Sequence, residues 1–474
     1  MFQRFSSLLL SVLLIGPLAA QDRWSLERCV KYARENSLVI RQALAQIRNA
    51  ELTLKQNQLS RLPNLSAGVS GGYQFGRTID PTTNSFALEG IGFNSYSLNS
   101  GIQVFGGGVI RHNIERSRHE LEAGKLEAEA TENDLGLQVA AAYLNVLLAE
   151  EQQAIARTRA LQSVKQLEQV SRFIAVGARP TNERFDFEAT LALDQQALVE
   201  AENVKLRALL SLRQLLLIPE GTPFEIEKPE IRIPEDADLD GISTGELFAA
   251  ASTILPQVKA AERRLLAAKT AILQSKAALF PSVVLFASLR SNFSNQARTL
   301  TGFNAVRVKQ NVFINGTPVA LEVEQNVPAF ARTTYFNQIQ ENFGQSLGIQ
   351  LNIPIYNNGL TRINIERAQL GVISGEVARE QARQRLRSDI EQVVTAVRAS
   401  RRSLQAANLA LKAATAAFEN AGKRYELGAI NSLEFNTTRT NLERARSENS
   451  RARFQHLFNL KQLDFYQGKP ITLD

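Results

Sequence analysis

The chain has 474 residues, a formal net charge of +7 and 44% hydrophobic residues. This hydrophobic fraction excludes an intrinsically disordered protein, while the 21% of charged residues excludes a bundle of membrane-spanning helices. The positive excess is small for this length, and arginines are scattered beside glutamates rather than clustered with aromatic residues. We therefore expect no nucleic-acid partner.

Residues 1–20 have the features of a secretory signal peptide. Arg4 gives a basic start, an apolar run covers 8–20, and the polar Gln21 follows at once. The run is too short to cross a bilayer, so we expect cleavage after Ala20 and export of the mature chain. The single cysteine, Cys29, can form no disulfide within the chain.

The mature chain contains an internal repeat. Residues 36–65 align without gaps with residues 254–283, and each segment reads as a helix that stops at an X-Pro pair. Further along, equal spacings separate Val104 from Ile355 and Val176 from Leu427. The two halves therefore carry the same long element between these points.

Each half is expected to run helix, strand, strand, very long helix, turn, helix. We place repeat 1 at residues 21–218 and repeat 2 at 243–470, joined at 219–242 by an acidic, proline-rich linker. The expected helices cover 24–62, 109–218, 243–279 and 359–467, and the expected strands cover 64–76, 93–105, 281–291 and 342–355.

The long helices are the diagnostic feature. No proline occurs in 110–179 or 356–469. A continuous helix of about 68 residues would measure about 100 Å, which does not fit inside a globule. Apolar residues recur every seven positions in the second half, which predicts a coiled-coil seam of Ile390, Val397, Leu404, Leu411 and Phe418. The first half is less regular, with Val139, Val146, Ala160 and Leu167 in the equivalent register.

The strands alternate between apolar residues and small or polar ones. In the first, Leu65, Ala67 and Val69 alternate with serine and glycine. Such alternation over about 10 residues is typical of strands that cross an outer membrane. The third strand has apolar residues on both sides, including Val284 and Phe286, so its register stays open. The conformation of the 292–341 loop also stays open.

Four such strands cannot enclose a pore, because even eight barely leave room for side chains. An open sheet edge has no water to bond in hydrocarbon, so a spanning sheet must close on itself. We therefore expect an obligate oligomer in which neighbouring copies complete the barrel.

Taken together, these features resemble the TolC-like outer membrane efflux protein family over nearly all of the mature chain. The resemblance rests on the repeat, the helix-Pro-strand joins, the junctions at 104–108 and 354–359, and the turn at 424–434. It implies an α+β membrane protein: a homotrimer whose 12-stranded outer-membrane β-barrel continues into a periplasmic α-helical barrel. It further implies a channel-tunnel that exports small molecules or proteins, contacts outer membrane lipid, and docks on a periplasmic adaptor coupled to an inner-membrane pump.

The resemblance also assigns roles at the helix tips. It places the periplasmic entrance and the adaptor contact at Val176, Gly177, Arg179, Arg424, Tyr425, Leu427 and Gly428. Glu183 and Glu434 stand six residues past the glycines, where threefold copies would ring the mouth with negative charge and favour cations. The alternative, that they are ordinary acids at helix starts, stays open. Relatives often have a basic residue where this chain has Ile430, so any closing salt bridge must differ.

Other functions have less support. A trimeric stalk or adhesin without a transport role would share the signal peptide and coiled coils, but its strands would appear once rather than twice. A soluble periplasmic adaptor would lack the apolar strand face. His112 and His119 have no third ligand nearby, and no nucleophile stands beside a base, so we expect no metal, no cofactor and no enzyme. The cargo and the cognate pump cannot be deduced.

Overall fold

The structure, a computed structural model, describes residues 23–470 apart from 80–83, 85, 88–89, 230–240, 242 and 315, together with residue 472. The expected signal peptide lies outside the described residues, as does about half of the expected linker. The chain divides into two compact units: one holds 1–51, 119–265 and 373–474, and the other holds 52–118 and 266–372.

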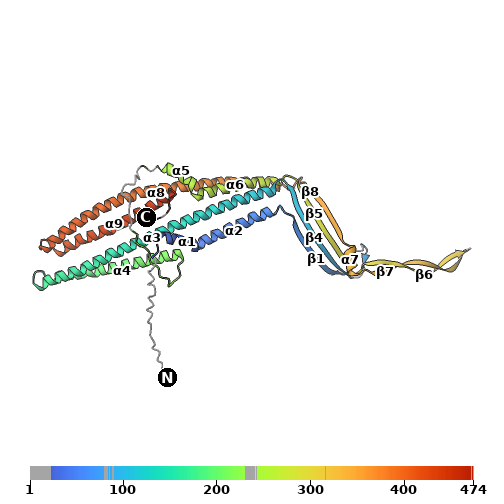
Figure 1. The fold of residues 1–474 in the computed structure, drawn as a ribbon, viewed down its shortest axis with the longest axis horizontal. Helices are drawn as coiled ribbons and strands as arrows, with labels where there is room; N and C mark the ends of the chain where they lie inside the picture. Colours follow the sequence, from blue (N-terminus) through green and yellow to red (C-terminus); the bar gives the residue numbers. More distant parts are fainter. Residues whose placement is uncertain are drawn as a thin grey trace, which may run out of the picture. The chain divides into compact units, whose positions relative to one another are not determined.

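The first unit is helical. Its long antiparallel pairs are α3 with α4 and α8 with α9 (Figure 1). Both α3 and α8 are 67 residues long. Among the described residues, no helix is both long and apolar enough to cross a membrane. The helices of the chain's two halves are α1 (Leu26–Asn36), α2 (Leu38–Leu59), α3 (Val109–Ala175), α4 (Glu183–Leu216), α5 (Thr244–Ile254), α6 (Pro256–Ala277), α8 (Leu360–Glu426) and α9 (Ser432–Tyr466).

Two helices that we expected to be continuous are broken. The expected helix 24–62 divides at Ser37, whose backbone is extended between α1 and α2. The expected helix 243–279 divides at Leu255, between α5 and α6. At Leu255 the cause is local, because the ring of Pro256 disfavours the helical conformation of the residue before it.

The expected heptad seam is buried at Ile390 and Val397, whereas its other members, Leu404, Leu411 and Phe418, are only partly buried. Ile390 and Val397 are each 1% exposed and share a core with Leu463 of α9. In the first half, Val139 and Val146 are fully buried in a second core that α3 forms with α1 and α4. The seven-residue spacing therefore identified the packed face over part of each long helix.

The backbone of Trp24, before α1, pairs with the described part of the linker. The Trp24 and Glu225–Glu227 backbones exchange two hydrogen bonds of 2.9 Å. The Tyr143 hydroxyl of α3 lies 3.0 Å from the Trp24 carbonyl and 2.7 Å from that of Glu227. The linker thus has structure of its own, held against the helical core.

The second unit contains a four-stranded antiparallel sheet in the order β1-β4-β5-β8. Its strands are β1 (Asn64–Gln74), β4 (Ile91–Gly106), β5 (Ser282–Ser294) and β8 (Gly344–Asn352). The fourth strand is shorter than the expected 342–355. Asn342 instead caps a helix, and Pro354 lacks the N–H that would extend the ladder.

The sheet register gathers the apolar residues on one face. Directly paired residues point to the same side of an antiparallel sheet. Ile102, Leu285 and Ile349 form one such row across three strands. The third strand therefore places its odd-numbered residues on the apolar face, and Phe286 lies opposite, against Gly348. Leu65, Val69, Tyr73, Leu347 and Ile349 of the edge strands are each at least 70% exposed.

The 292–341 segment, whose conformation the sequence left open, folds into regular structure. It forms the antiparallel ribbon β6–β7, followed by a short helix that leads into β8 (Figure 1). A second, very small sheet is formed by the part of the chain that connects β1 to β4. The bounds of these elements are β2 (Thr78–Ile79), β3 (Phe86–Ala87), β6 (Arg298–Ile314), β7 (Thr317–Arg332) and α7 (Tyr335–Glu341).

Candidate functional site

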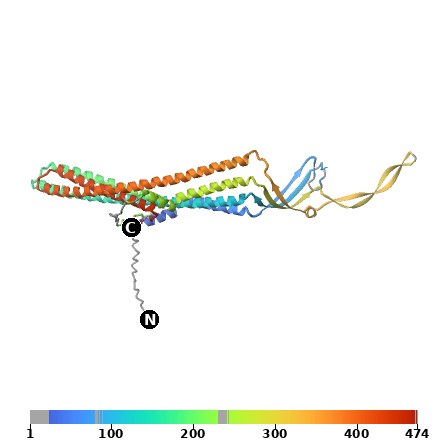
Figure 2. The same ribbon diagram turned by 90° about the horizontal axis from the view of Figure 1, so that it is seen from above.

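The two helix-turn-helix tips have the same backbone geometry. Gly177 after α3 has φ +74° and Gly428 after α8 has φ +76°. After each glycine, the next amide donates a 2.8 Å hydrogen bond back to the helix, to Phe173 in one tip and to Arg424 in the other. This left-handed helix end favours glycine, since a side chain there would be strained. The turns lie close together at one end of the helical unit (Figure 2).

Tyr425 connects the two tips. Its hydroxyl donates a 3.1 Å hydrogen bond to Glu183 at the start of α4. The Arg179 guanidinium stacks over the Tyr425 ring at 4.4 Å, donates to the Tyr425 carbonyl and forms a 3.5 Å ion pair with Glu183. Three residues that the sequence singled out therefore meet in one contact, which we call the tip latch: Arg179, Glu183 and Tyr425.

The tip latch is largely shielded from water. The side chains of Arg179 and Glu183 are only 14% and 13% exposed. The pKa of Tyr425 is raised above its ordinary value, chiefly because burial disfavours the phenolate and secondarily because the Glu183 carboxylate is near. Tyr425 is thus held in its protonated form, which is the form that can donate to Glu183.

Ile430 has an apolar role in place of the basic residue expected from relatives. It is 6% exposed and belongs to a cluster that includes Phe187 of α4 and Phe435 of α9. The Tyr425 ring stacks on Phe435 at 4.8 Å. The link between the halves at this level therefore combines apolar packing with the tip latch, and the cation comes from Arg179 of the first half.

The second expected carboxylate has a different environment. Glu434 pairs with Arg424 at 3.4 Å, and both side chains are 53% exposed. The Glu434 amide also donates a 2.9 Å hydrogen bond to the side-chain oxygen of Asn431, which caps α9. An exposed pair of this kind contributes little to stability. The side chain of Glu434 is accessible to solvent although it is paired.

Large apolar side chains project from the tips into solvent. Val176 is 77% exposed and Leu427, its counterpart in the other half, is 84% exposed. Phe185 and Leu433, in the first turns of α4 and α9, are 66% and 73% exposed. An exposed apolar group of this size, rimmed by charged residues, is characteristic of a surface that binds another protein.

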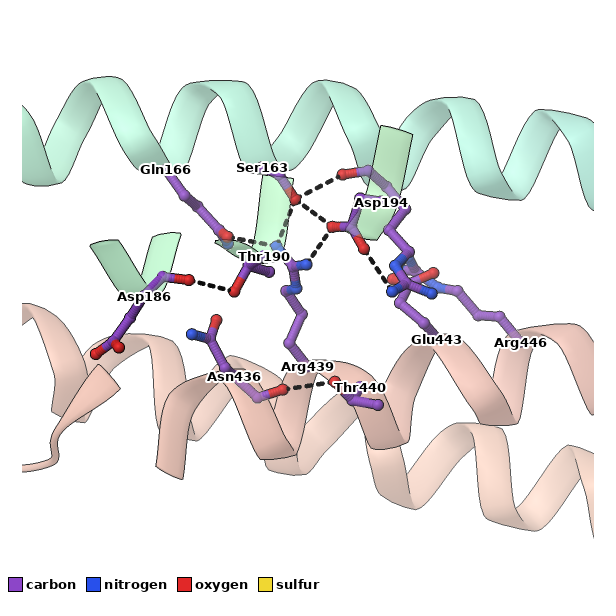
Figure 3. A network of polar contacts seen from close by, with 11 residues as sticks. Ser163, Gln166, Asp186, Thr190, Asp194, Asn436, Arg439, Thr440, Glu443 and Arg446 are labelled. Atoms are coloured by element: carbon purple, nitrogen blue, oxygen red, sulfur yellow. Dashed lines mark hydrogen bonds and ion pairs between the residues drawn. The ribbon is translucent and has the colours of Figure 1, made fainter. Parts of the chain in front are cut away.

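A second polar network, farther along the same helices, was missed by our sequence reasoning. Asp194 of α4 is fully buried and forms ion pairs with Arg159 of α3 and Arg439 of α9 (Figure 3). Arg439 also donates 2.8 Å and 2.7 Å hydrogen bonds to Ser163 and Gln166. A sequence signal existed: Asp194 lies seven residues after the buried Phe187, on the same face of α4.

Comparison with known proteins assigns the family. A model of the outer membrane efflux protein family matches residues 29–216 and 254–469. The chain belongs to the outer membrane efflux protein family. The two matched segments lie within residues 21–218 and 243–470, where the sequence predicts its two repeats. Members of this family are outer membrane channels, so the chain is an export channel of the outer membrane with its helices in the periplasm, and the stalk or adhesin alternative is not supported.

Individual relatives agree with this assignment. The chain is 26% identical over 418 residues to the pyoverdine export outer membrane protein OpmQ of Pseudomonas aeruginosa, covering 85% of this chain and 76% of the relative. The fold matches the outer membrane protein VceC of Vibrio cholerae, with TM-score 0.72, 15% identity and 94% and 96% of the two chains covered. It also matches the CmeC outer membrane channel of Campylobacter jejuni, with TM-score 0.71, 16% identity and coverage of 96% and 88%.

Proposed function

We propose that three copies of the chain form one channel-tunnel. The four-stranded sheet ends in two edge strands, β1 and β8, that have no partner within the described chain. Backbone groups at those edges require partners in hydrocarbon, and the edges of neighbouring copies supply them. Three sheets give a 12-stranded barrel whose exposed apolar face contacts outer membrane lipid.

The channel acts as a passive duct between an inner-membrane pump and the exterior. The exposed apolar residues at the tips, with Val176 and Leu427 the most prominent, form the contact for a periplasmic adaptor. The glycine turns set the shape of this contact, because Gly177 and Gly428 hold both tips in the same conformation. Arg424 and Tyr425 lie on the α8 side of this contact region.

The tip latch holds the periplasmic entrance closed. The observation that carries this proposal is the direct contact of Tyr425 with both Arg179 and Glu183, which ties the α8–α9 hairpin to the α3–α4 hairpin. Adaptor binding opens the entrance by favouring a state in which the two hairpins separate at their tips. A ligand shifts such an equilibrium only through its differential affinity for the two states.

The two entrance carboxylates have separate tasks. Glu183 serves the tip latch and is shielded in the closed state, whereas Glu434 is accessible. When the latch opens, Glu183 loses its hydrogen bond from Tyr425 but keeps Arg179, which lies on the same hairpin, and it joins Glu434 in lining the mouth. Threefold copies of both would then attract cations.

The cargo is a small molecule rather than a protein. This part of the proposal draws on the similar protein OpmQ, whose name records pyoverdine export. The pump selects which small molecules are exported, since the channel itself catalyses no reaction.

The test is ion selectivity in planar bilayers. The double variant Glu183→Gln, Glu434→Gln is expected to reduce the preference for potassium over chloride by several-fold. The matched control is Glu366→Gln, an exposed carboxylate of α8 outside the tips. Unchanged selectivity in the double variant would remove both residues from the entrance. Absence of trimers or of conductance in the unaltered protein would contradict the channel assembly itself.

A further inference from the structure

The ribbon β6–β7 is long and has a regular register. Sixteen residue pairs run from Arg298 opposite Arg332 to Ile314 opposite Thr317, with one irregularity between Leu300 and Gly302. At about 3.4 Å per residue, the ribbon extends for about 50 Å. Gly316 in the connecting turn has φ +84°, a conformation that favours glycine.

The register separates the ribbon's side chains onto two different faces. Val308 lies opposite Val323 and Val312 lies opposite Val319, and cross-strand partners share a face. We call this side the aliphatic face. Its polar positions are filled by uncharged side chains such as Gln310. Its aliphatic residues, each between 38% and 44% exposed, are Val306, Val308, Val312, Val319, Leu321, Val323 and Val327.

The opposite face carries every charged residue between 302 and 329. Arg307 forms a 3.5 Å ion pair with Glu324. Lys309 lies directly opposite Glu322. The two cations and two anions therefore balance one another across the strands in the middle of this face. Phe303 and Phe313, which are 64% and 71% exposed, lie toward its two ends.

The base of the ribbon is held firmly against β5. Gln338 of α7 is 2% exposed and connects the last residue of β5 with the residue that follows β7. Its amide accepts from the Ser294 N–H at 2.9 Å and donates to the carbonyls of Ser294 and Thr333 at 2.9 Å and 3.0 Å. The Ser291 hydroxyl adds a 2.7 Å hydrogen bond to the Ile339 carbonyl. The ribbon thus emerges from a fixed base rather than from a loose loop.

A ribbon of two strands needs a further layer to be stable. An isolated two-stranded hairpin is marginal in water, because it buries neither face. The aliphatic face measures about 50 Å by 10 Å, or about 500 Å², which is the upper range of apolar patches that monomers leave exposed. Nothing else in the described part of the unit packs on this face, since its seven aliphatic side chains remain accessible.

We propose that the aliphatic face is an interface between copies of this chain, where it packs against the same face of the ribbons of neighbouring subunits. The proposal rests on the trimer of the proposed function. An interface of about 500 Å² per copy is small for free partners, which bury about 800 Å² each. Subunits already joined through the sheet edges hold their ribbons at high effective concentration, so the small interface suffices.

A membrane surface fits the aliphatic face less well. Residues that settle at the lipid headgroup level are typically tryptophan and tyrosine, and the face has neither. The charged face has no net charge, so it offers no attraction to anionic headgroups. β-branched residues such as Val308, by contrast, pack well against another sheet.

Cysteine cross-linking on intact cells tests the proposal, because long loops between the strands of an outer-membrane barrel face the exterior when its helices are periplasmic. Val308→Cys places a thiol on the aliphatic face, and Lys309→Cys places one at the same level on the charged face. The native Cys29 gives little background because it is fully buried and its thiol pKa is raised to about 12 by burial. With a short bismaleimide, we expect Val308→Cys to yield covalently linked subunits at least tenfold more than Lys309→Cys.

Two further outcomes would overturn the inference. One is equal or absent cross-linking at both positions in a protein that still migrates as a trimer, and the other is a product between Val308→Cys and a different protein. Leu321→Cys, on the same face, repeats the test if Val308→Cys fails to assemble. Failure of the unaltered protein to form trimers would instead contradict the proposed function.

Protease accessibility gives an independent readout. The double variant Val308→Lys, Leu321→Lys is expected to separate the ribbons and to increase trypsin cleavage of the ribbon on intact cells at least tenfold. The control adds charge at two positions of the opposite face, Asn311→Lys and Asn326→Lys. Equal cleavage in both double variants would overturn the inference.

Discussion

Tyr425, one residue before the end of α8, donates a 3.1 Å hydrogen bond to Glu183, the first residue of α4. The two residues come from different helical hairpins, and each lies within six residues of the glycine at which its hairpin turns. The contact lies beside apolar packing of Phe187 and Phe435, so its geometry is fixed by the core beneath it.

Removing the Tyr425 hydroxyl should favour the open entrance. Hydrogen bonds to charged groups contribute about 1.5–3 kcal/mol, so Tyr425→Phe is expected to raise the ratio of open to closed channels by about 10- to 100-fold. Single-channel recording measures this ratio. Tyr356→Phe, at an 82% exposed position away from the tips, is the control. An unaltered open probability in Tyr425→Phe would show that the hydroxyl does not hold the entrance shut.

The buried Asp194–Arg439 pair should be costly to break from one side. Asp194→Asn leaves the guanidinium of Arg439, whose side chain is 3% exposed, without its anion, and we expect a loss of about 3–5 kcal/mol in unfolding free energy. Denaturation in detergent measures it. In the exposed pair of Glu448 and Arg451, Glu448→Gln should cost less than about 1 kcal/mol.

The same pair allows a double replacement. Asp194→Leu combined with Arg439→Met removes both charges and fills the space with apolar atoms. Much of the stability lost in Asp194→Asn should return, because the buried Arg439 charge is gone and Arg159, which also loses its anion, is 28% exposed and reaches water. If the double variant were less stable than either single variant, the ion pair would stabilise the fold by more than the neutralisation of one charge by the other.

Acidification should weaken the packing of α8 on α9 through His456. This residue is 3% exposed and its Nδ1 lies 2.9 Å from the Ser400 hydroxyl. Burial, aided by Arg401, lowers its pKa below the ordinary 6.5. The unfolded chain therefore takes up a proton at a higher pH than the folded chain does. Stability is expected to be full above pH 6.5 and to fall as the pH drops below it.

The measurement is the denaturation midpoint at pH 7.5 and at pH 5.5. His456→Gln keeps a hydrogen-bonding side chain but does not titrate, so the loss of stability between these pH values should be smaller than in the unaltered protein. An identical loss in both proteins would assign the effect to other groups.

A side chain at Gly348 should disrupt the sheet. A Cβ built there would lie 2.5 Å from the Phe286 ring on the adjacent strand. Gly348→Val is therefore expected to cost about 1–3 kcal/mol and to lower the yield of heat-resistant assemblies on gels. Phe286→Ala in the same chain should restore the yield. Gly371→Ala serves as the control, because a Cβ there meets nothing within 4 Å.

The sequence identified the helices and strands well where periodicity was strong. The heptads of α8 predicted the buried positions of Ile390 and Val397, and the alternation in β1 predicted its apolar face. The ribbon β6–β7 was missed, although Asn315-Gly316 between valine-rich alternating segments is a strong hairpin signal. Short-range patterns of this kind are local, so a sequence can report them directly.

Contacts between the two repeats were decided only by the tertiary structure. The sequence marked Arg179, Glu183 and Tyr425 separately, but nothing local brings residues from separate repeats together. The same holds for Asp194 and Arg439, because the heptad spacing can place Asp194 on the packed face of α4 but does not identify Arg439 as its partner. The physical reason is that a charge is buried or exposed according to which helix covers it. Chain periodicity fixes the face of a helix, whereas only packing fixes the neighbour of that face.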